Sequence, residues 1–108
     1  MSTNGTPTAG FSSFREFYPF YLDEHRNRTS RRLHVIGSAL VLVILGLVIS
    51  PLLSAWWLLA LPVVGYGFAW VGHFFFEHNK PATFKHPVYS LIGDWVMFKD
   101  VLTGKIPF

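Results

Sequence analysis

Apolar side chains dominate one long, unbroken part of the sequence. From Val35 to Phe76 the chain contains no aspartate, glutamate, lysine or arginine. A hydrocarbon layer of about 30 Å is crossed by roughly 20 apolar helical residues, so this stretch is long enough for two crossings. Ser50-Pro51 lies near its middle, and because proline lacks an amide donor and restricts the residue before it, the first helix should end there. The pattern predicts transmembrane helices over about 30–50 and 54–78, the second kinked at Pro62 unless neighbouring groups satisfy the freed carbonyl.

Shorter amphipathic segments flank this apolar stretch. Residues from Phe11 to Asp23 are dense in phenylalanine and tyrosine, and Pro19 within them predicts a short helix and a break. From Pro87 to Leu102, apolar residues recur at helical spacing, which predicts an interfacial helix packed beneath the two crossings. Residues 1–10 lack a basic region and an adjoining apolar run, so we expect a disordered tail and not a signal peptide. The predicted fold class is all-α: a helical hairpin of two transmembrane helices with flanking amphipathic, interfacial helices, forming one membrane-embedded domain over 11–108.

Composition and charge agree with a membrane protein. Hydrophobic residues make up 51% of the chain, aromatic residues 18% and charged residues 14%, a balance typical of that class. Positive charges gather before the first predicted crossing and after the second, whereas the loop between them has none, so the positive-inside rule places both termini in the cytoplasm. Beside an apolar hairpin, these basic flanks favour anionic lipid headgroups over nucleic acid as a partner. The chain has no cysteine, which excludes disulfides, thiolate metal ligands and a cysteine nucleophile.

The five histidines lie just outside the uncharged stretch or at its ends. His25 and His34 are nine positions apart, which on one continuous helix means opposite faces and a separation of about 13 Å along the axis. They can share a metal only if the chain breaks between them, and the segment 27–30 is rich in residue types that favour helix caps and turns. In an antiparallel hairpin, His34 and His73 would lie at similar depth on the same side. Because an imidazole inside an apolar helix is unfavourable without a partner, these two residues predict a functional site.

Glu77 is the acidic residue best placed to join these histidines. It follows His73 by four positions, so the two share one face of a helix, and a carboxylate beside three phenylalanines needs a counter-charge or a metal. The alternative for Glu77 is an ion pair with Arg31 or Arg32. Imidazole and carboxylate ligands suit a divalent transition metal better than Mg²⁺ or Ca²⁺, and they leave zinc and iron(II) both open.

Five runs of the sequence resemble motifs of a known protein family. They are Tyr21 to Asn27, Arg32 to Gly37, Gly65 to Glu77, Asn79 to Thr83 and Pro87 to Asp94. On these motifs the chain closely resembles the small membrane 2-hydroxy fatty acid dioxygenases, long catalogued as a domain of unknown function, from about Phe14 to Gly104. The resemblance implies an iron(II)-dependent enzyme of fatty acid α-oxidation. Such an enzyme removes one carbon from a 2-hydroxy acyl chain, as in breakdown of the phytosphingosine base.

Carried over residue by residue, the resemblance implies three ligands for one iron(II) ion: His25, His34 and His73. Glu77 completes a His-x-x-x-Glu pattern and is the predicted catalytic residue, as a fourth ligand or as a group that orients an imidazole. A second metal would need weaker candidate ligands, and basic residues at the headgroup level would attract a substrate carboxylate. The weaker ligands are Glu77, His78, His86 and Asp94, although His86 is also expected to be an ordinary solvated or hydrogen-bonded histidine; the basic residues are Arg31, Arg32 and Lys80.

The mechanism that fits these residues has the substrate's carboxylate and 2-hydroxyl oxygens chelating the iron(II) while dioxygen takes a remaining site. Cleavage between C1 and C2 would give an acid one carbon shorter and CO₂. The acyl tail would lie along the apolar wall among Trp56, Trp57, Phe74, Phe75 or their neighbours. The expected partners are therefore a 2-hydroxy fatty acid, dioxygen and membrane lipids, with no nucleic acid, and homo-oligomer formation is left open.

Localisation and two rival functions stay open on the sequence. The short chain favours a bacterial origin and hence the inner membrane, whereas a eukaryotic chain would be expected in the endoplasmic reticulum. One rival function is a non-enzymatic lipid-binding or assembly hairpin whose histidines only form hydrogen bonds. The other is a zinc-dependent membrane hydrolase. The metal content of the purified protein separates all three functions.

Overall fold

The computed structural model describes residues 10–108, and within that range the chain is all-helical with no strand. The disordered tail predicted for 1–10 lies, except for Gly10, outside the described residues. The elements in chain order are α1 (Phe14–Asp23), α2 (Arg28–Ile49), the 3₁₀ helix η1 (Ala55–Leu59), α3 (Ala60–Val71), the π-helix η2 (Gly72–Glu77), the short 3₁₀ helix η3 (Ala82–Phe84) and α4 (Pro87–Leu102).

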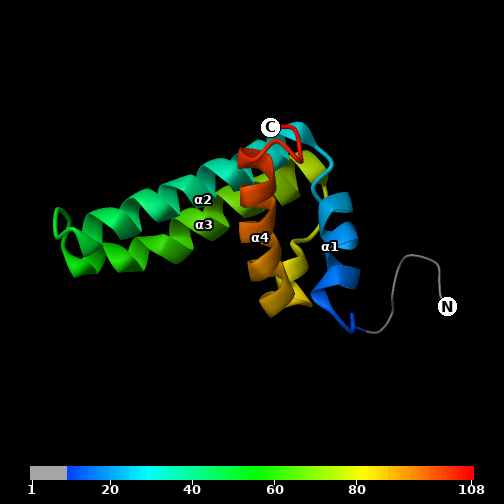
Figure 1. Cartoon of the computed structure of the whole chain (residues 1–108), viewed down its shortest axis with the longest axis horizontal. Coiled ribbons are helices and arrows are strands. Elements are labelled where there is room, and N and C mark those ends of the chain that lie inside the picture. Colours follow the sequence, from blue (N-terminus) through cyan, green and yellow to red (C-terminus); the bar gives the residue numbers. More distant parts are fainter. Residues whose placement is uncertain (1–9) are drawn as a thin grey trace.

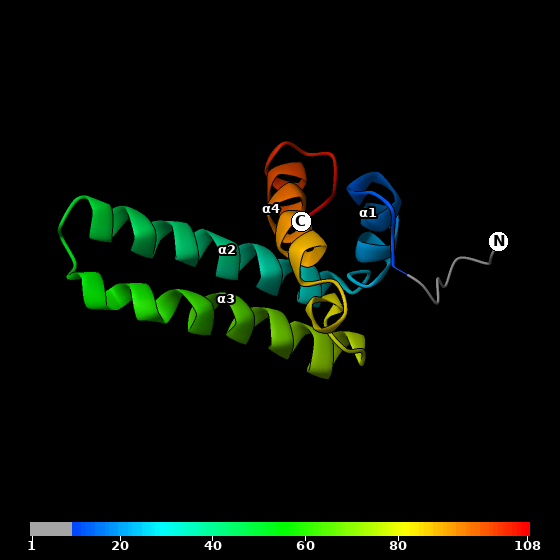
Figure 2. The same cartoon turned by 90° about the horizontal axis from the view of Figure 1, so that it is seen from below.

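The longest elements are two apolar helical runs that lie side by side (Figures 1 and 2). They are α2, with 22 residues, and the continuous run from Ala55 to Glu77, with 23 residues. By length and composition, both could cross a membrane. They correspond to the crossings predicted over about 30–50 and 54–78. Pro62 lies in the first turn of α3, directly after η1, where the winding changes from 3₁₀ to α.

The remaining helices gather at one end of this pair, at the opposite end from its connecting loop (Figures 1 and 2). The predicted bounds of α4, Pro87 to Leu102, are confirmed. The break predicted at Pro19 is wrong, because α1 continues through it. Phe17 and Tyr21 on either side of Pro19 are fully buried, and burying each contributes about 1.5–3 kcal/mol. That gain offsets the roughly 3 kcal/mol that a proline inside a helix costs.

Buried side chains are confined to the same end of the molecule. Phe17, Tyr21 and Met97 form its core with Ala82, and they bring α1, α4 and η3 together. By contrast, no residue from 38 to 71 is buried. The half of the α2–α3 pair that lies toward the connecting loop is therefore apolar on its outside, while the other end carries a compact, specific core.

Candidate metal centre

A tight turn between α1 and α2 brings His25 back toward His34. α1 ends at Asp23, and α2 begins at Arg28 after the N-cap residue Asn27. The side-chain oxygen of Asn27 accepts the Ser30 N–H at 3.1 Å, which satisfies one of the amides left free at a helix start. The predicted chain break between the two histidines is therefore confirmed.

The π-helix η2 presents His73 to the same place from the other apolar run. Its first residue, Gly72, lies against α2 so closely that a Cβ there would be 2.8 Å from Ser30 Oγ. Only glycine permits this approach, which leaves the next residue facing α2. π-helices add a residue to a helical turn and often occur at functional sites. The local winding thus fixes where His73 points.

Three buried histidines form one compact group, as predicted for His25, His34 and His73. One ring nitrogen from each lies within 4.8 Å of the others, and the exposed fractions of the three residues are 1%, 6% and 2%. Nε2 of His25 is 3.0 Å from Nε2 of His34. The cavity that the three rings help to line holds about 20 Å³, roughly the space of one water molecule or ion.

Each imidazole is held by an oxygen on its other nitrogen. Nδ1 of His25 lies 2.6 Å from the Tyr21 carbonyl oxygen, and Nδ1 of His34 lies 3.1 Å from that of Ser30. Nδ1 of His73 lies 2.7 Å from Asn79 Oδ1. These oxygens can only accept, so each Nδ1 carries the hydrogen and donates it. The three Nε2 atoms are left with free lone pairs, which is the tautomer that metal-binding histidines commonly adopt.

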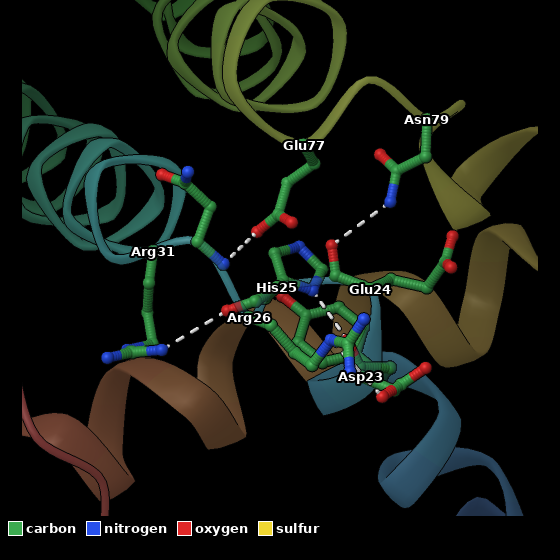
Figure 3. A network of polar contacts seen from close by, with 9 residues as sticks. Asp23, Glu24, His25, Arg26, Arg31, Glu77 and Asn79 are labelled. Carbon is green, nitrogen blue, oxygen red and sulfur yellow. Dashed lines mark hydrogen bonds and ion pairs between the residues drawn. The ribbon is translucent and has the colours of Figure 1, made fainter.

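The amide of Asn79 is itself oriented by a second contact. Its Nδ2 donates to the Glu24 carbonyl oxygen at 3.3 Å, as Figure 3 shows. Because the amide nitrogen is used there, the amide oxygen faces His73. Asn79 therefore links the end of η2 to the chain just after α1, and it sets the ring orientation of one histidine.

The electrostatics of this group favour a metal cation. Lone pairs of His25 and His34 that face each other at 3.0 Å repel unless a positive charge lies between them. A proton is disfavoured, because burial, together with the neighbouring histidines, lowers the pKa of His25 well below its ordinary value. The three residues thus fit a transition metal, and an all-nitrogen set does not suit Mg²⁺ or Ca²⁺.

A tyrosine and an aspartate complete the polar wall of the cavity. The Tyr21 ring stacks on His25 with centroids 4.1 Å apart, and its hydroxyl donates to Asp94 Oδ1 at 2.5 Å. Burial raises the pKa of Asp94 to about 6. Asp94 lines the same cavity as the three histidines, but it is not part of the histidine group that could hold a metal ion. Its predicted role as a weaker ligand stays a prediction.

The other predicted ligands lie outside the histidine group. The Glu77 carboxylate accepts the backbone N–H of Asn27 at 2.7 Å, at the start of α2 (Figure 3). His78 is exposed and adopts a left-handed φ of 58° where η2 ends. The His86 ring packs against aromatic rings of the α1 region, with a centroid 5.1 Å from that of Phe11. The catalytic role of Glu77 stays a prediction, whereas its observed contact ties the two apolar runs together.

The basic residues predicted to attract a carboxylate have other contacts. Arg31 donates to the His25 carbonyl oxygen at 3.2 Å (Figure 3) and to that of Pro107 at 3.0 Å. Arg32 donates to the Phe108 backbone oxygen at 3.1 Å. Lys80 is exposed and borders a hollow next to Glu24 rather than the histidine cavity. Their role in substrate binding stays a prediction.

Three residues of the centre were not predicted from the sequence. They are Tyr21 and Ser30, which act through their backbone carbonyls, and Asn79, which acts through its side chain. A backbone carbonyl leaves no trace in residue type. Asn79 lies in one of the family-like runs, but its spacing from His73 carries no recognisable ligand pattern.

Comparison with known proteins gives one result. A protein-family model described as "2-hydroxy-palmitic acid dioxygenase Mpo1-like" matches residues 11–106. No curated protein and no solved structure matches the chain. The matched range covers nearly the whole sequence and confirms the resemblance drawn from its motifs.

Proposed function

Because the chain belongs to the 2-hydroxy-palmitic acid dioxygenase Mpo1-like family, we propose that it is an iron(II)-dependent dioxygenase that removes one carbon from 2-hydroxy fatty acids. The observation that carries the proposal is the buried group of three histidines, in which one ring nitrogen of each lies within 4.8 Å of the other two. The reaction balances without a further reductant: R–CH(OH)–COOH and O₂ give R–COOH, CO₂ and H₂O. The C1–C2 bond breaks, C2 is oxidised to the new carboxyl carbon, and dioxygen is reduced.

His25, His34 and His73 would hold the iron(II). When bound, the ion supplies the redox chemistry that allows dioxygen to react with an organic acid. The chain's own contribution is to orient the ligands, since each Nδ1–H is committed to an oxygen. Burial of all three rings excludes bulk water from the place where the substrate's two oxygens would bind.

Asp94 and Tyr21 supply the polar edge of the cavity. The Asp94 carboxylate accepts from the Tyr21 hydroxyl through Oδ1, which leaves its other oxygen free to accept a hydrogen bond from a substrate hydroxyl. A 2-hydroxy acid presents such a donor next to its carboxylate, whereas an unhydroxylated acid does not. A hydrogen bond from the 2-hydroxyl group to Asp94 would therefore favour the hydroxylated acid over the unhydroxylated one.

The proposed site lies at a membrane surface, with α2 and the run from Ala55 to Glu77 crossing the bilayer. Only 17% and 11% of their most apolar windows are buried, whereas the core helix of a soluble protein is mostly buried. All the arginines precede Val35 and all the lysines follow Glu77, so every basic residue lies at the histidine end of the two runs. By the positive-inside rule, that end and both termini would face the cytoplasm. Membrane lipids are then partners, and nucleic acid is not.

The first experiment is to measure metal content and turnover in the same preparation. Protein purified anaerobically in detergent and loaded with iron(II) should convert 2-hydroxyhexadecanoic acid to pentadecanoic acid, with the carboxyl carbon released as CO₂. Hexadecanoic acid is the matched control and should remain unchanged. Equal turnover of both acids, or turnover without dioxygen, would contradict the proposal.

The same preparation separates the rival functions. A zinc-dependent hydrolase would retain zinc and show no dioxygen consumption with a 2-hydroxy acid. A lipid-binding hairpin without a metal would bind neither ion at stoichiometric levels, and replacing the three histidines would leave its lipid binding unchanged.

A further inference from the structure

A second, larger cavity adjoins the histidine cavity. It holds about 190 Å³ and lies between α2, α3 and α4. Four residues line both cavities, so the two lie directly against each other: they are His34, Tyr66, Ala69 and Asp94. The larger cavity thus begins at the proposed reaction centre and leads away from it.

The larger cavity runs along the helices, toward the loop end of the α2–α3 pair. Its α2 wall consists of His34, Ser38 and Val41, which recur once per turn over about 10 Å. Its α3 wall extends from Ala69 back to Leu61. Leu91 and Trp95 of α4 provide the third side. Away from the shared polar end, where Asp94 lies, the lining contains no charged residue, so the cavity is an apolar channel with one polar end.

We propose that this channel binds the acyl chain of the 2-hydroxy acid, with C1 and C2 at the histidines and the methylene chain running between α2, α3 and α4. The proposal rests on the proposed function and names the substrate-binding site for it. An amphiphile with one chelating head and one linear apolar tail matches a small polar cavity that opens into an apolar channel. Carbons beyond the level of Val41 would leave the channel into the surrounding lipid.

This location differs from the wall predicted from the sequence. The side chains of Trp56 and Phe75 are 79% and 69% exposed, and neither lines the cavity that adjoins the histidines. In a bilayer, such side chains contact bulk lipid on all sides and cannot select one acyl chain. The channel instead contacts the chain from α2, α3 and α4 next to the reacting carbons.

Gly65 sets the width of the channel. A Cβ at this position would lie 3.6 Å from Val41 Cγ2, so an added methyl group fits, whereas a longer side chain would extend into the space between α2 and α3. Gly67 offers a matched control on the same helix, because a Cβ there has nothing within 4 Å. Both substitutions replace a helical glycine by the same residue, so they share the change in helix propensity.

Binding is tested without turnover, by photo-crosslinking in phosphatidylcholine vesicles. The probe is a 2-hydroxyhexadecanoic acid with a diazirine in the middle of its chain, and the labelled peptides are mapped by mass spectrometry. We expect labels on the walls formed by Val41, Leu61 and Trp95, and suppression of labelling by excess unlabelled 2-hydroxy acid. Labels concentrated at Trp56, Trp57, Phe74 or Phe75, or labels insensitive to the competitor, would overturn the channel. Because no turnover is needed, this result stands apart from failure of the dioxygenase reaction.

Chain-length selection gives the second readout. In Gly65→Leu, labelling by the long-chain probe and turnover of 2-hydroxyhexadecanoic acid should both fall by about tenfold or more, since a hydrophobic site discriminates at this level for small changes in volume. The short 2-hydroxyhexanoic acid should be processed as before, and metal content should not change. Gly67→Leu should leave both chain lengths unaffected. Equal effects of the two substitutions would contradict the proposal.

Trp95→Ala covers the case in which Gly65→Leu fails to insert or fold. It widens the channel from α4, so it should raise the labelling yield of a chain-branched 2-hydroxy acid relative to the linear one. An unchanged ratio would also contradict the channel.

Discussion

The two ends of this molecule are held together by different physical means. At the histidine end, buried aromatic side chains and directional hydrogen bonds fix individual residues, such as Tyr21 against Asp94 and Asn79 against His73. At the loop end, no residue from 38 to 71 is buried, and the apolar character of the surface matters more than any one contact. The comparison teaches that chemistry depends on side-chain identity at one end, while the other end needs only length and hydrophobicity.

The largest expected effect of this difference between the two ends comes from replacing a histidine. His25→Ala, His34→Ala or His73→Ala should abolish stoichiometric metal binding, because two nitrogen donors remain where three converge. Membrane insertion should persist, since alanine is at least as apolar as the histidine that it replaces and the rest of both apolar runs is unchanged. Elemental analysis and carbonate extraction of membranes measure the two properties. His78→Asn is the control, because asparagine tolerates the left-handed backbone there. Full metal occupancy in all three alanine variants would refute the ligand assignment.

The opposite end is tested by adding a charge. Val43→Arg in α2 places a guanidinium at an exposed apolar position, which should cost about 2.5–3.5 kcal/mol of insertion free energy. Val88→Arg in α4 makes the same change at a similarly exposed valine, with exposed fractions of 55% and 68% for the two residues. We expect loss of membrane-integrated protein for Val43→Arg alone, measured by insertion assays with glycosylation reporters. Equal insertion of the two variants would show that α2 does not lie in the bilayer.

The elements that follow from side-chain pattern were predictable. The apolar runs, α4 with its proline in the first turn, and the cap at Asn27 all depend on residue types at regular spacing. The meeting of His34 and His73 followed from antiparallel packing alone. Pro19 was misjudged because tertiary burial outweighed a local propensity.

What the sequence did not reveal depends on winding and on long-range contacts. The spacing of four from His73 to Glu77 predicts a shared face on an α-helix, but η2 is a π-helix, and the Glu77 carboxylate instead accepts the Asn27 backbone N–H. An extra residue per turn has no compositional signature. The Tyr21–Asp94 pair joins residues 73 positions apart, and only the packing of α1 against α4 brings them together.

A smaller change at the histidine end tests whether metal affinity depends on the hydrogen bonds that orient the histidine rings. Asn79→Leu removes the acceptor of the His73 Nδ1–H, and loss of such a partner lowers metal affinity by about 10–100-fold. Asn79→Asp keeps an acceptor at the same place and should retain most of the affinity. Competition with a chelator of known affinity measures both variants. Equal weakening by the two substitutions would mean that Asn79 acts through packing and not through its oxygen.

The smallest expected effects come from two glycines. A Cβ on Gly93 would lie 2.8 Å from the buried Tyr21 ring, whereas one on Gly46 has nothing within 4 Å. Gly93→Ala should therefore lower stability by about 1–3 kcal/mol through overpacking. Gly46→Ala should be neutral or stabilising by up to about 1 kcal/mol through helix propensity. Thermal unfolding in detergent compares them, and destabilisation by Gly46→Ala would place an unrecognised contact at the loop end.

The three histidines come from three separate segments: the turn after α1, the second turn of α2 and η2. A ligand that needs all three binds only when those segments have docked, so metal binding and docking are thermodynamically linked. At a free metal concentration a hundredfold above its dissociation constant, this linkage would add about 2.7 kcal/mol to the docked state. The ion would then act as a folding ligand as well as a cofactor. Metal withdrawal would expose the turn between α1 and α2 to proteases first, while the two apolar runs keep their place.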